Sequence, residues 1–159
     1  MALLKLKIIS LGRVRQRFIQ EGEQEYLARL KGSASVEIVE IDCDKVSQSS
    51  VERAKHKESE LLLARIDPGE FLCALDERGK TFTSELFAQE IQNRMNQGHP
   101  RIVFALGASH GFDESVRKRA NLVLSLSAMT FPFQLSRLIL IEQLYRALSI
   151  LSGHPYHKK

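Results

Sequence analysis

Hydrophobic residues recur along the chain in short runs, separated by longer segments with helical spacing. The runs Leu3–Leu11 and Val36–Ile41 alternate apolar with charged residues, which is typical of strands. The runs Glu70–Leu75, Ile102–Leu106 and Leu122–Leu126 contain almost no charge, which is typical of strands covered on both faces of a sheet. The pattern therefore predicts five strands, three of which are buried.

Five helices are predicted between and after these strands. They span Arg15–Lys31, Ser49–Ile66, Ser84–Met95, Glu114–Arg119 and Phe133–Leu151. Pro132 suits the first turn of the last helix, because its missing N–H would have no partner there. The alternation of strands and helices predicts an α/β fold, with a mostly parallel sheet and helices on both faces. Ligands of such folds bind at the carboxyl ends of the strands.

Length and composition limit the class of protein. A chain of 159 residues, 43% of them hydrophobic, fits a single domain that spans residues 1–159. We expect neither a membrane span nor a signal peptide, because every long apolar run is interrupted by charge, and a cytoplasmic protein is predicted. Cys43 and Cys73 lie far apart in or just after apolar runs, so buried thiols are favoured over a disulfide or a metal site.

Positive charge is more informative in its distribution than in its total. The formal net charge of +4 only permits a polyanionic partner. Basic residues cluster at Arg13–Arg17, at Arg117–Arg119 and in the tail His154–Lys159. Each cluster alone is most simply a solvated face. Because the clusters follow strands or end the chain, we expect them to share one surface.

Three loops follow the buried strands and are the candidate ligand contacts. In the loop Asp76–Lys80, Asp76 either accepts a hydrogen bond from a ribose or an amine, or belongs to a polar turn. The loop Gly107–Phe112 contains glycine but matches neither of the common phosphate-binding patterns. In the loop Leu126–Phe131, main-chain groups can bind an adenine edge; the alternative is that Met129 and Phe131 pack the helix against the sheet.

The last helix is apolar around most of its circumference. A surface helix has one apolar stripe, so this helix needs cover on two sides. A homodimer interface explains the pattern most economically, and a thicker core is the alternative.

The segments FALGASHGF, LSLSAMTFPFQLSRLILIEQLYRA and GHPYHKK resemble the RlmH family of SPOUT-class methyltransferases, and KIISLGR and EYLARL extend the likeness to nearly the whole chain. The resemblance implies methylation of N3 of a pseudouridine in 23S ribosomal RNA, with S-adenosylmethionine as cofactor. It also implies a homodimer and a C-terminal trefoil knot, an exception to the rule against knots.

The resemblance assigns roles to residues of this chain. The implied cofactor contacts are Leu75, Gly107, Leu126, Ser127, Ala128, Met129, Thr130 and Phe131. In the dimer, the tail Pro155–Lys158 would reach the cofactor site of the partner and face the RNA. Candidates for the target side are His157, whose ordinary pKa leaves it mostly neutral at pH 7, then His154 and Tyr156. Arg137 could hold the base or an RNA phosphate, or be an ordinary helix-surface cation. For the histidines, the alternative is a flexible tail without a fixed role.

Two positions depart from the family pattern. Ala108 stands where the family has a second glycine, and Phe133 stands where it has histidine. These departures leave open a second hypothesis, a SPOUT-like dimer that binds RNA or cofactor but methylates weakly or not at all. A third is another nucleotide-binding α/β protein. The small size of the chain predicts that the substrate is the assembled ribosome.

Overall fold

The computed structural model describes residues 3–43, 50–99, 101–107 and 111–156. Strands and helices alternate along these residues, which confirms the predicted α/β pattern. The elements are β1 (Leu4–Leu11), α1 (Arg17–Leu30), β2 (Ala34–Ile41), α2 (Val51–Leu63), β3 (Phe71–Thr81), α3 (Ser84–Asn96), β4 (Ile102–Leu106), α4 (Glu114–Arg119), β5 (Leu122–Ser125) and α5 (Phe133–Ser152). Except at the end of β3, their bounds differ from the predicted ones by three residues at most. The predicted start of α2, Ser49, lies outside the described residues.

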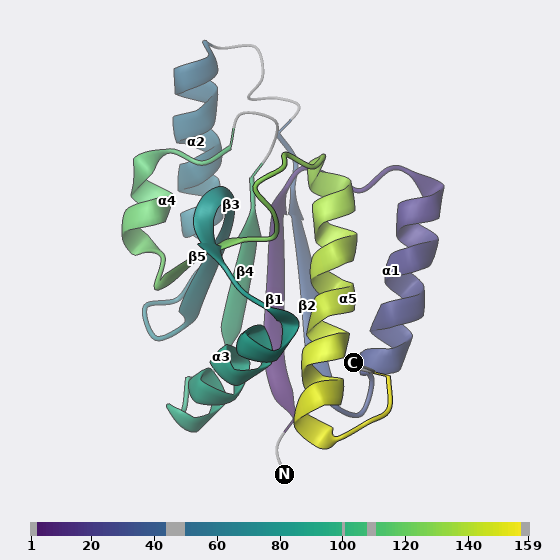
Figure 1. The fold of residues 1–159 in the computed structure, drawn as a ribbon. Helices are drawn as coiled ribbons and strands as arrows, with labels where there is room; N and C mark the ends of the chain where they lie inside the picture. The colour runs from purple at the N-terminus through teal and green to yellow at the C-terminus, as the bar shows by residue number, and fades with distance from the viewer. Residues whose placement is uncertain (1–2, 44–49, 100, 108–110, 157–159) are drawn as a thin grey trace.

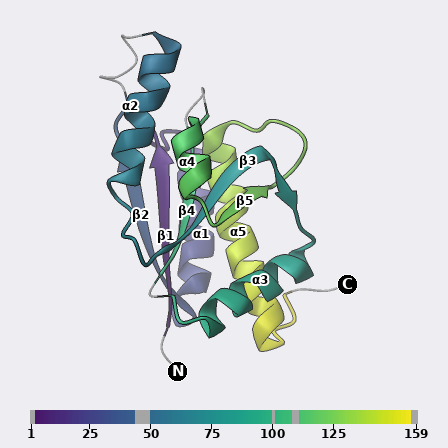
Figure 2. The same cartoon turned by 90° about the vertical axis from the view of Figure 1, so that its left-hand side faces the viewer.

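The strands form one parallel sheet in the order β2-β1-β4-β3-β5. On β1, Ile8 pairs with Ile38 of β2 on one side and with Phe104 of β4 on the other. Helices α1, α3 and α5 cover one face of the sheet, and α2 and α4 cover the other, as Figures 1 and 2 show. The predicted parallel sheet with helices on both faces is therefore confirmed.

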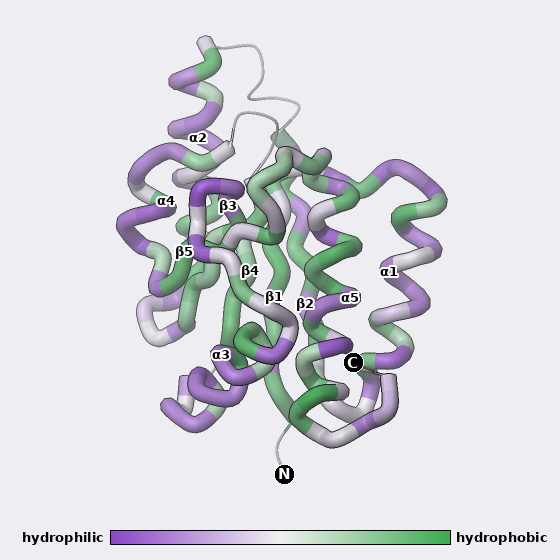
Figure 3. The backbone as a smooth tube through the Cα atoms, in the orientation of Figure 1, coloured by the Kyte–Doolittle hydropathy of each residue, from purple (hydrophilic) through white to green (hydrophobic). Residues whose placement is uncertain are grey.

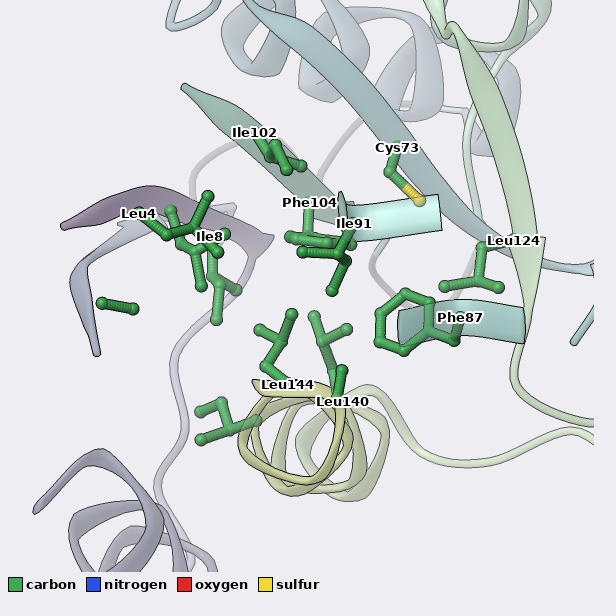
Figure 4. Close-up of a cluster of buried hydrophobic side chains, with 14 of the residues drawn as sticks. Leu4, Ile8, Cys73, Phe87, Ile91, Ile102, Phe104, Leu124, Leu140 and Leu144 are labelled. Atoms are coloured by element: carbon green, nitrogen blue, oxygen red, sulfur yellow. The ribbon is translucent and has the colours of Figure 1, made fainter. Parts of the chain in front are cut away.

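Two hydrophobic clusters hold these layers together, because successive strand residues point to opposite faces. Ile8 and Phe104 pack with Leu140 of α5 in the first cluster (Figure 4). Ile9 and Val103 pack in the second cluster, with α2 and α4. The central strands are accordingly hydrophobic along their length, whereas the helices alternate between polar and apolar residues (Figure 3). Burial on both faces explains the absence of charge in the runs that predicted β3, β4 and β5.

The strand β3 continues to Thr81, so the prediction that Asp76–Lys80 forms a loop is wrong. Leu75 and Lys80 both pair with Leu124 of β5, and the four residues between them bulge from the ladder. Gly79 makes this possible, because a Cβ there would lie 2.5 Å from the carbonyl oxygen of Val123. The bulge lets β3 resume pairing after a polar stretch.

The two cysteines are free and differ in burial. Cys73 is 1% exposed in the first cluster, and burial raises the pKa of its thiol. Cys43 is only half-buried, so the expectation of a buried thiol is wrong for this residue.

Candidate functional site

A cleft of about 1140 Å³ opens at the carboxyl ends of the strands. Its volume slightly exceeds the roughly 300–1000 Å³ of common ligand pockets. Leu11, Leu75 and Leu106 line it from β1, β3 and β4, and the segment from Leu124 to Phe133 closes another side. This is the end of the sheet that the sequence predicted for a ligand (upper part of Figure 1).

The loop Leu126–Phe131 is shaped by hydrogen bonds from the end of β5, within the loop itself and to β3. Ser125 Oγ donates to the carbonyl of Ser127 at 2.9 Å, and Ser127 Oγ accepts from the N–H of Met129 at 3.0 Å. Thr130 Oγ1 donates to the carboxylate of Glu77. The Met129 side chain is 73% exposed, so the alternative that it packs α5 against the sheet is wrong.

The predicted cofactor residues converge on this cleft with one exception. Those in its lining are Leu75, Gly107, Leu126, Ser127, Met129, Thr130 and Phe131, whereas Ala128 is exposed and outside the lining. A Cβ on Gly107 would lie 3.1 Å from Cα of Gly111, so glycine lets the two main-chain segments approach closely. Ala108 lies outside the described residues.

Asp76 makes internal hydrogen bonds at the cleft. Its Oδ2 accepts from Nη2 of Arg117 at 2.8 Å, and its Oδ1 accepts from the N–H of Arg78 at 2.9 Å. The carboxylate thus joins β3 to α4, and its bond to the N–H two residues later is that of a polar turn inside the bulge of β3.

Phe133, at the start of α5, faces Gly12 at the end of β1. A Cβ on Gly12 would lie 3.0 Å from the Phe133 ring, and the φ of 127° at Gly12 is strained for any other residue. Both residues line the cleft. The position that departs from the family pattern is therefore part of the site.

Several cations surround the cleft. Arg13, Arg15 and Arg117 belong to the clusters seen in the sequence, and Lys55 and Arg78 join them in the lining. Lys55 was not predicted as a site residue, because it is one of many charges on α2. Only the fold brings it to the cleft. The shared surface is incomplete, since Arg119 instead donates to the carbonyls of Asp67 and Glu70 at the other end of β3. Lys158 and Lys159 lie outside the described residues.

Arg137 is buried, so the alternative that it is an ordinary helix-surface cation is wrong. Its Nε and Nη2 donate to the two carboxylate oxygens of Glu23 at 2.6 and 2.7 Å. Its Nη1 donates to Glu40 at 2.9 Å and to Ser10 at 3.1 Å. Burial opposes the charge, but the hydrogen bonds to Glu23 and Glu40 raise the pKa of Arg137. In this structure the guanidinium faces these partners and does not line the cleft.

The described part of the tail follows the end of α5 that is away from the cleft and turns back beside the C-terminal half of that helix (lower part of Figure 1). The helix has 20 residues, which corresponds to a length of about 30 Å. Tyr156 Oη donates to Glu142 at 3.0 Å. The Tyr156 ring packs edge-on against the ring of Tyr145, with 4.6 Å between the two ring centroids. Burial, then Tyr26 and Glu142, raise the pKa of Tyr156. The exposed His154 accepts from the N–H of Tyr156, and His157 lies outside the described residues.

Comparison with known proteins decides the family. The family model described as "Predicted SPOUT methyltransferase" matches residues 4–157. The chain belongs to the SPOUT methyltransferase family. Relatives named "Ribosomal RNA large subunit methyltransferase H" include a protein of Carboxydothermus hydrogenoformans, 40% identical over 98% of this chain and 100% of its own length. The protein of that name from Pelotomaculum thermopropionicum is 42% identical over 96% of this chain and 98% of its own length.

The described residues contain neither a membrane-spanning helix nor a candidate metal site. Within residues 3–43, 50–99, 101–107 and 111–156, no helix is long and apolar enough to cross a membrane. In the same residues, no group of three or more His, Cys, Asp or Glu side chains has an arrangement that could hold a metal ion.

Proposed function

We propose that this SPOUT-family protein is an S-adenosylmethionine-dependent methyltransferase of the cytoplasm that modifies N3 of a pseudouridine in 23S ribosomal RNA of the assembled ribosome. The observation that supports this most directly is the cleft at the carboxyl ends of the parallel strands, in a chain with full-length relatives named for methylation of large-subunit ribosomal RNA. The cations around the cleft suit a polyanionic substrate.

The lining fits a nucleoside cofactor. Leu75, Leu126 and Phe131 offer apolar cover for an adenine ring, and the main chain around Ser127 and Gly107 offers donors and acceptors. We propose that Leu126–Phe131, including Ala128, is the adenine-binding loop, and that the C-terminal segment forms a trefoil knot around it. S-adenosylmethionine, when bound, supplies an electrophilic methyl group on a sulfonium. Side chains must then align the target N3 and accept its proton.

The target-side groups in this proposal come from a second copy of the chain. Tyr156 is held against Glu142 and Tyr145 of α5, and His154 follows the end of that helix, so neither residue lines the cleft of its own chain in this structure. In a homodimer with antiparallel α5 helices, the tail of one protomer would meet the cleft of its partner. The exposed Phe18, Leu135 and Leu151 of α1 and α5 provide apolar surface for such an interface.

We propose His157, with His154, as the proton acceptor. Neutral imidazole accepts a proton near pH 7, whereas the raised pKa of Tyr156 keeps its phenol protonated. Tyr156 is then a donor or a stacking partner for the base, and Phe133 offers a second aromatic face. For Arg137, the internal hydrogen bonds favour a role in positioning over direct contact with the RNA.

Two measurements test this function. Titration calorimetry with S-adenosylmethionine should show saturable binding, and the absence of binding would rule out a cofactor cleft and leave another nucleotide-binding role. Incubation with labelled cofactor and ribosomes that lack the modification should place label in 23S RNA. Transfer to naked RNA as readily as to ribosomes would contradict the assembled ribosome as substrate.

A second candidate function is a cofactor- and RNA-binding dimer with weakened catalysis. Phe133 favours it, because a phenyl ring that faces Gly12 stands where the family pattern has an imidazole. Cofactor binding without transfer would support this candidate. The variant Phe133→His should then restore transfer; if it does not, Phe133 is not the cause.

A further inference from the structure

The connection between β1 and α1, residues Gly12–Gln16, is held by side chains from four elements. Two of them support its start: Ser10 Oγ donates to the carbonyl of Gly12 at 2.9 Å, and Glu40 of β2 accepts from the N–H of Val14 at 2.7 Å. From α1, Gln20 Nε2 donates to the carbonyl of Val14 at 3.0 Å.

Gln134 of α5 holds the other end of the connection. Its Oε1 accepts from the N–H of Arg15 at 3.0 Å and from the N–H of Gln16 at 3.1 Å. Gln16 is the N-cap residue of α1 and makes no capping hydrogen bond with its own side chain. The amide oxygen of Gln134, 118 residues after Gln16 in the chain, thus fixes both the end of the connection and the start of α1.

Arg137 supports the same connection indirectly, through side chains that bond to it. Its Nη1 donates both to Ser10 Oγ and to Glu40, the two side chains that hold the main chain of Gly12 and Val14. The Arg137 side chain is 5% exposed and bound bidentately to Glu23, so its own position is fixed. Gln134 and Arg137 are one turn of α5 apart, on the face that meets the connection.

The connection supported in this way is also part of the cleft. The connection forms one wall of the cleft, where Gly12 faces Phe133, and it brings Arg13 and Arg15 into the lining. The Arg13 side chain is 59% exposed, with Asp42 at 3.7 Å. An exposed cation on a rigid main chain loses less freedom on binding an anion than one on a mobile loop.

We propose that Gln134, backed by Arg137, is a positioning residue that fixes the Gly12–Gln16 connection so that Arg13 and Arg15 meet RNA phosphates at the mouth of the cleft. The proposal rests on the proposed function for its substrate. The fixed connection itself is independent of any substrate.

The test compares Gln134→Leu, which removes the acceptor, with Gln134→Glu, which keeps an acceptor oxygen. Gln92→Leu is the matched control, because Gln92 also lies half-buried on a helix and, among the residues that the structure describes, its side chain bonds to Asn96 of its own helix. Gln134 is changed in this test in place of Arg137, because replacement of Arg137 would remove a buried charge and none of these three substitutions does. NMR-detected hydrogen exchange reports on the amides of Arg15 and Gln16, and methyl transfer to ribosomes gives KM and kcat.

In Gln134→Leu, exchange at the amides of Arg15 and Gln16 should quicken by roughly fivefold or more, the effect of losing about one net hydrogen bond. KM for ribosomes should rise about as much, while kcat and cofactor affinity change less than about twofold. Gln134→Glu should keep slow exchange, and Gln92→Leu should match the unaltered protein in both respects.

Unchanged exchange in Gln134→Leu, or faster exchange without a change in KM, would overturn the proposal. Failure of the unaltered protein to transfer methyl groups would instead count against the proposed function, and the exchange rates would still decide whether Gln134 fixes the connection.

Discussion

Arg137 illustrates what a single residue reveals only in the folded chain. The sequence shows a cation on an apolar helix, but its partners Glu23 and Glu40 are 114 and 97 residues away. No local sequence pattern predicts a contact between residues so far apart along the chain. By contrast, the place of Gly107 and Ser127 in the cleft could be predicted, because Gly107 directly follows β4, Ser127 follows β5 after one residue, and the carboxyl ends of parallel strands meet at one edge of the sheet.

We predict that Arg137→Leu lowers the free energy of unfolding by about 3–5 kcal/mol, because it leaves Glu23 buried without its counter-charge. Urea unfolding measures the effect. The control Arg17→Leu breaks an ion pair with Glu21 in which the arginine side chain is 91% exposed, and it should change stability by no more than about 0.5 kcal/mol. Equal effects of the two substitutions would mean that the buried network contributes nothing specific.

At the scale of elements, strand and helix identity could be read from the sequence because burial on one or two faces dictates the hydrophobic period. The extension of β3 to Thr81 could not be read from the sequence. The residues Asp76–Lys80 are polar and contain glycine, which locally indicates a turn. Their strand character depends on β5, which pairs with Leu75 and again with Lys80 across the bulge. A register shift of this kind is a property of two strands together.

The bulge leads to a prediction about Gly79. Gly79→Ala should destabilise the protein by about 1–3 kcal/mol, because the new Cβ would meet the main chain of Val123, which cannot rotate away as a side chain can. Thermal unfolding measures the loss. Lys80→Ala, at the exposed neighbouring position, should cost less than about 1 kcal/mol. A Gly79→Ala protein as stable as the unaltered one would show that β3 and β5 can separate there without cost.

His56 links two helices on the other face of the sheet. Its Nδ1 lies 2.9 Å from Asp113, the N-cap residue of α4, and its Nε2 lies 3.2 Å from Glu60 within α2. The hydrogen bond to Asp113 and then the charge of Glu60 raise the pKa of His56. Burial opposes ionisation of Asp113, but hydrogen bonds from Ser115 and His56 outweigh it and lower the pKa of that carboxyl.

The sign of the pH dependence follows from these shifts. A raised histidine pKa stabilises the fold fully below the ordinary value of about 6.5, and the contribution is lost as pH rises through the folded pKa. His56→Gln should therefore lower Tm more at pH 5.5 than at pH 9. Thermal unfolding of both proteins across this range gives the comparison. A Tm difference that stays constant with pH would show that the charge on His56 does not hold α2 to α4.

At the scale of the whole molecule, the sheet order and the separation of cleft and tail could not be read from the sequence. The strand order β2-β1-β4-β3-β5 brings β1 beside β4 although 90 residues separate the end of one from the start of the other. The start of α5 lies at the cleft, whereas Tyr156 packs against Tyr145 in the C-terminal half of the same helix. The tail motif and the loop motifs are thus separated along α5 in one chain.

That separation predicts complementation between two inactive variants. One variant, Leu126→Arg, has a charged side chain in the cleft, and the other ends after Gly153 and lacks the tail. If each site combines one chain's cleft with the other's tail, both homodimers are inactive, but a heterodimer purified through two tags contains one intact site and should show about half the unaltered activity. Transfer of labelled methyl to ribosomes measures it. A heterodimer as inactive as its parents would mean that cleft and tail must belong to the same chain, and the tail would then have to leave Glu142 and Tyr145 and move along α5 to its start.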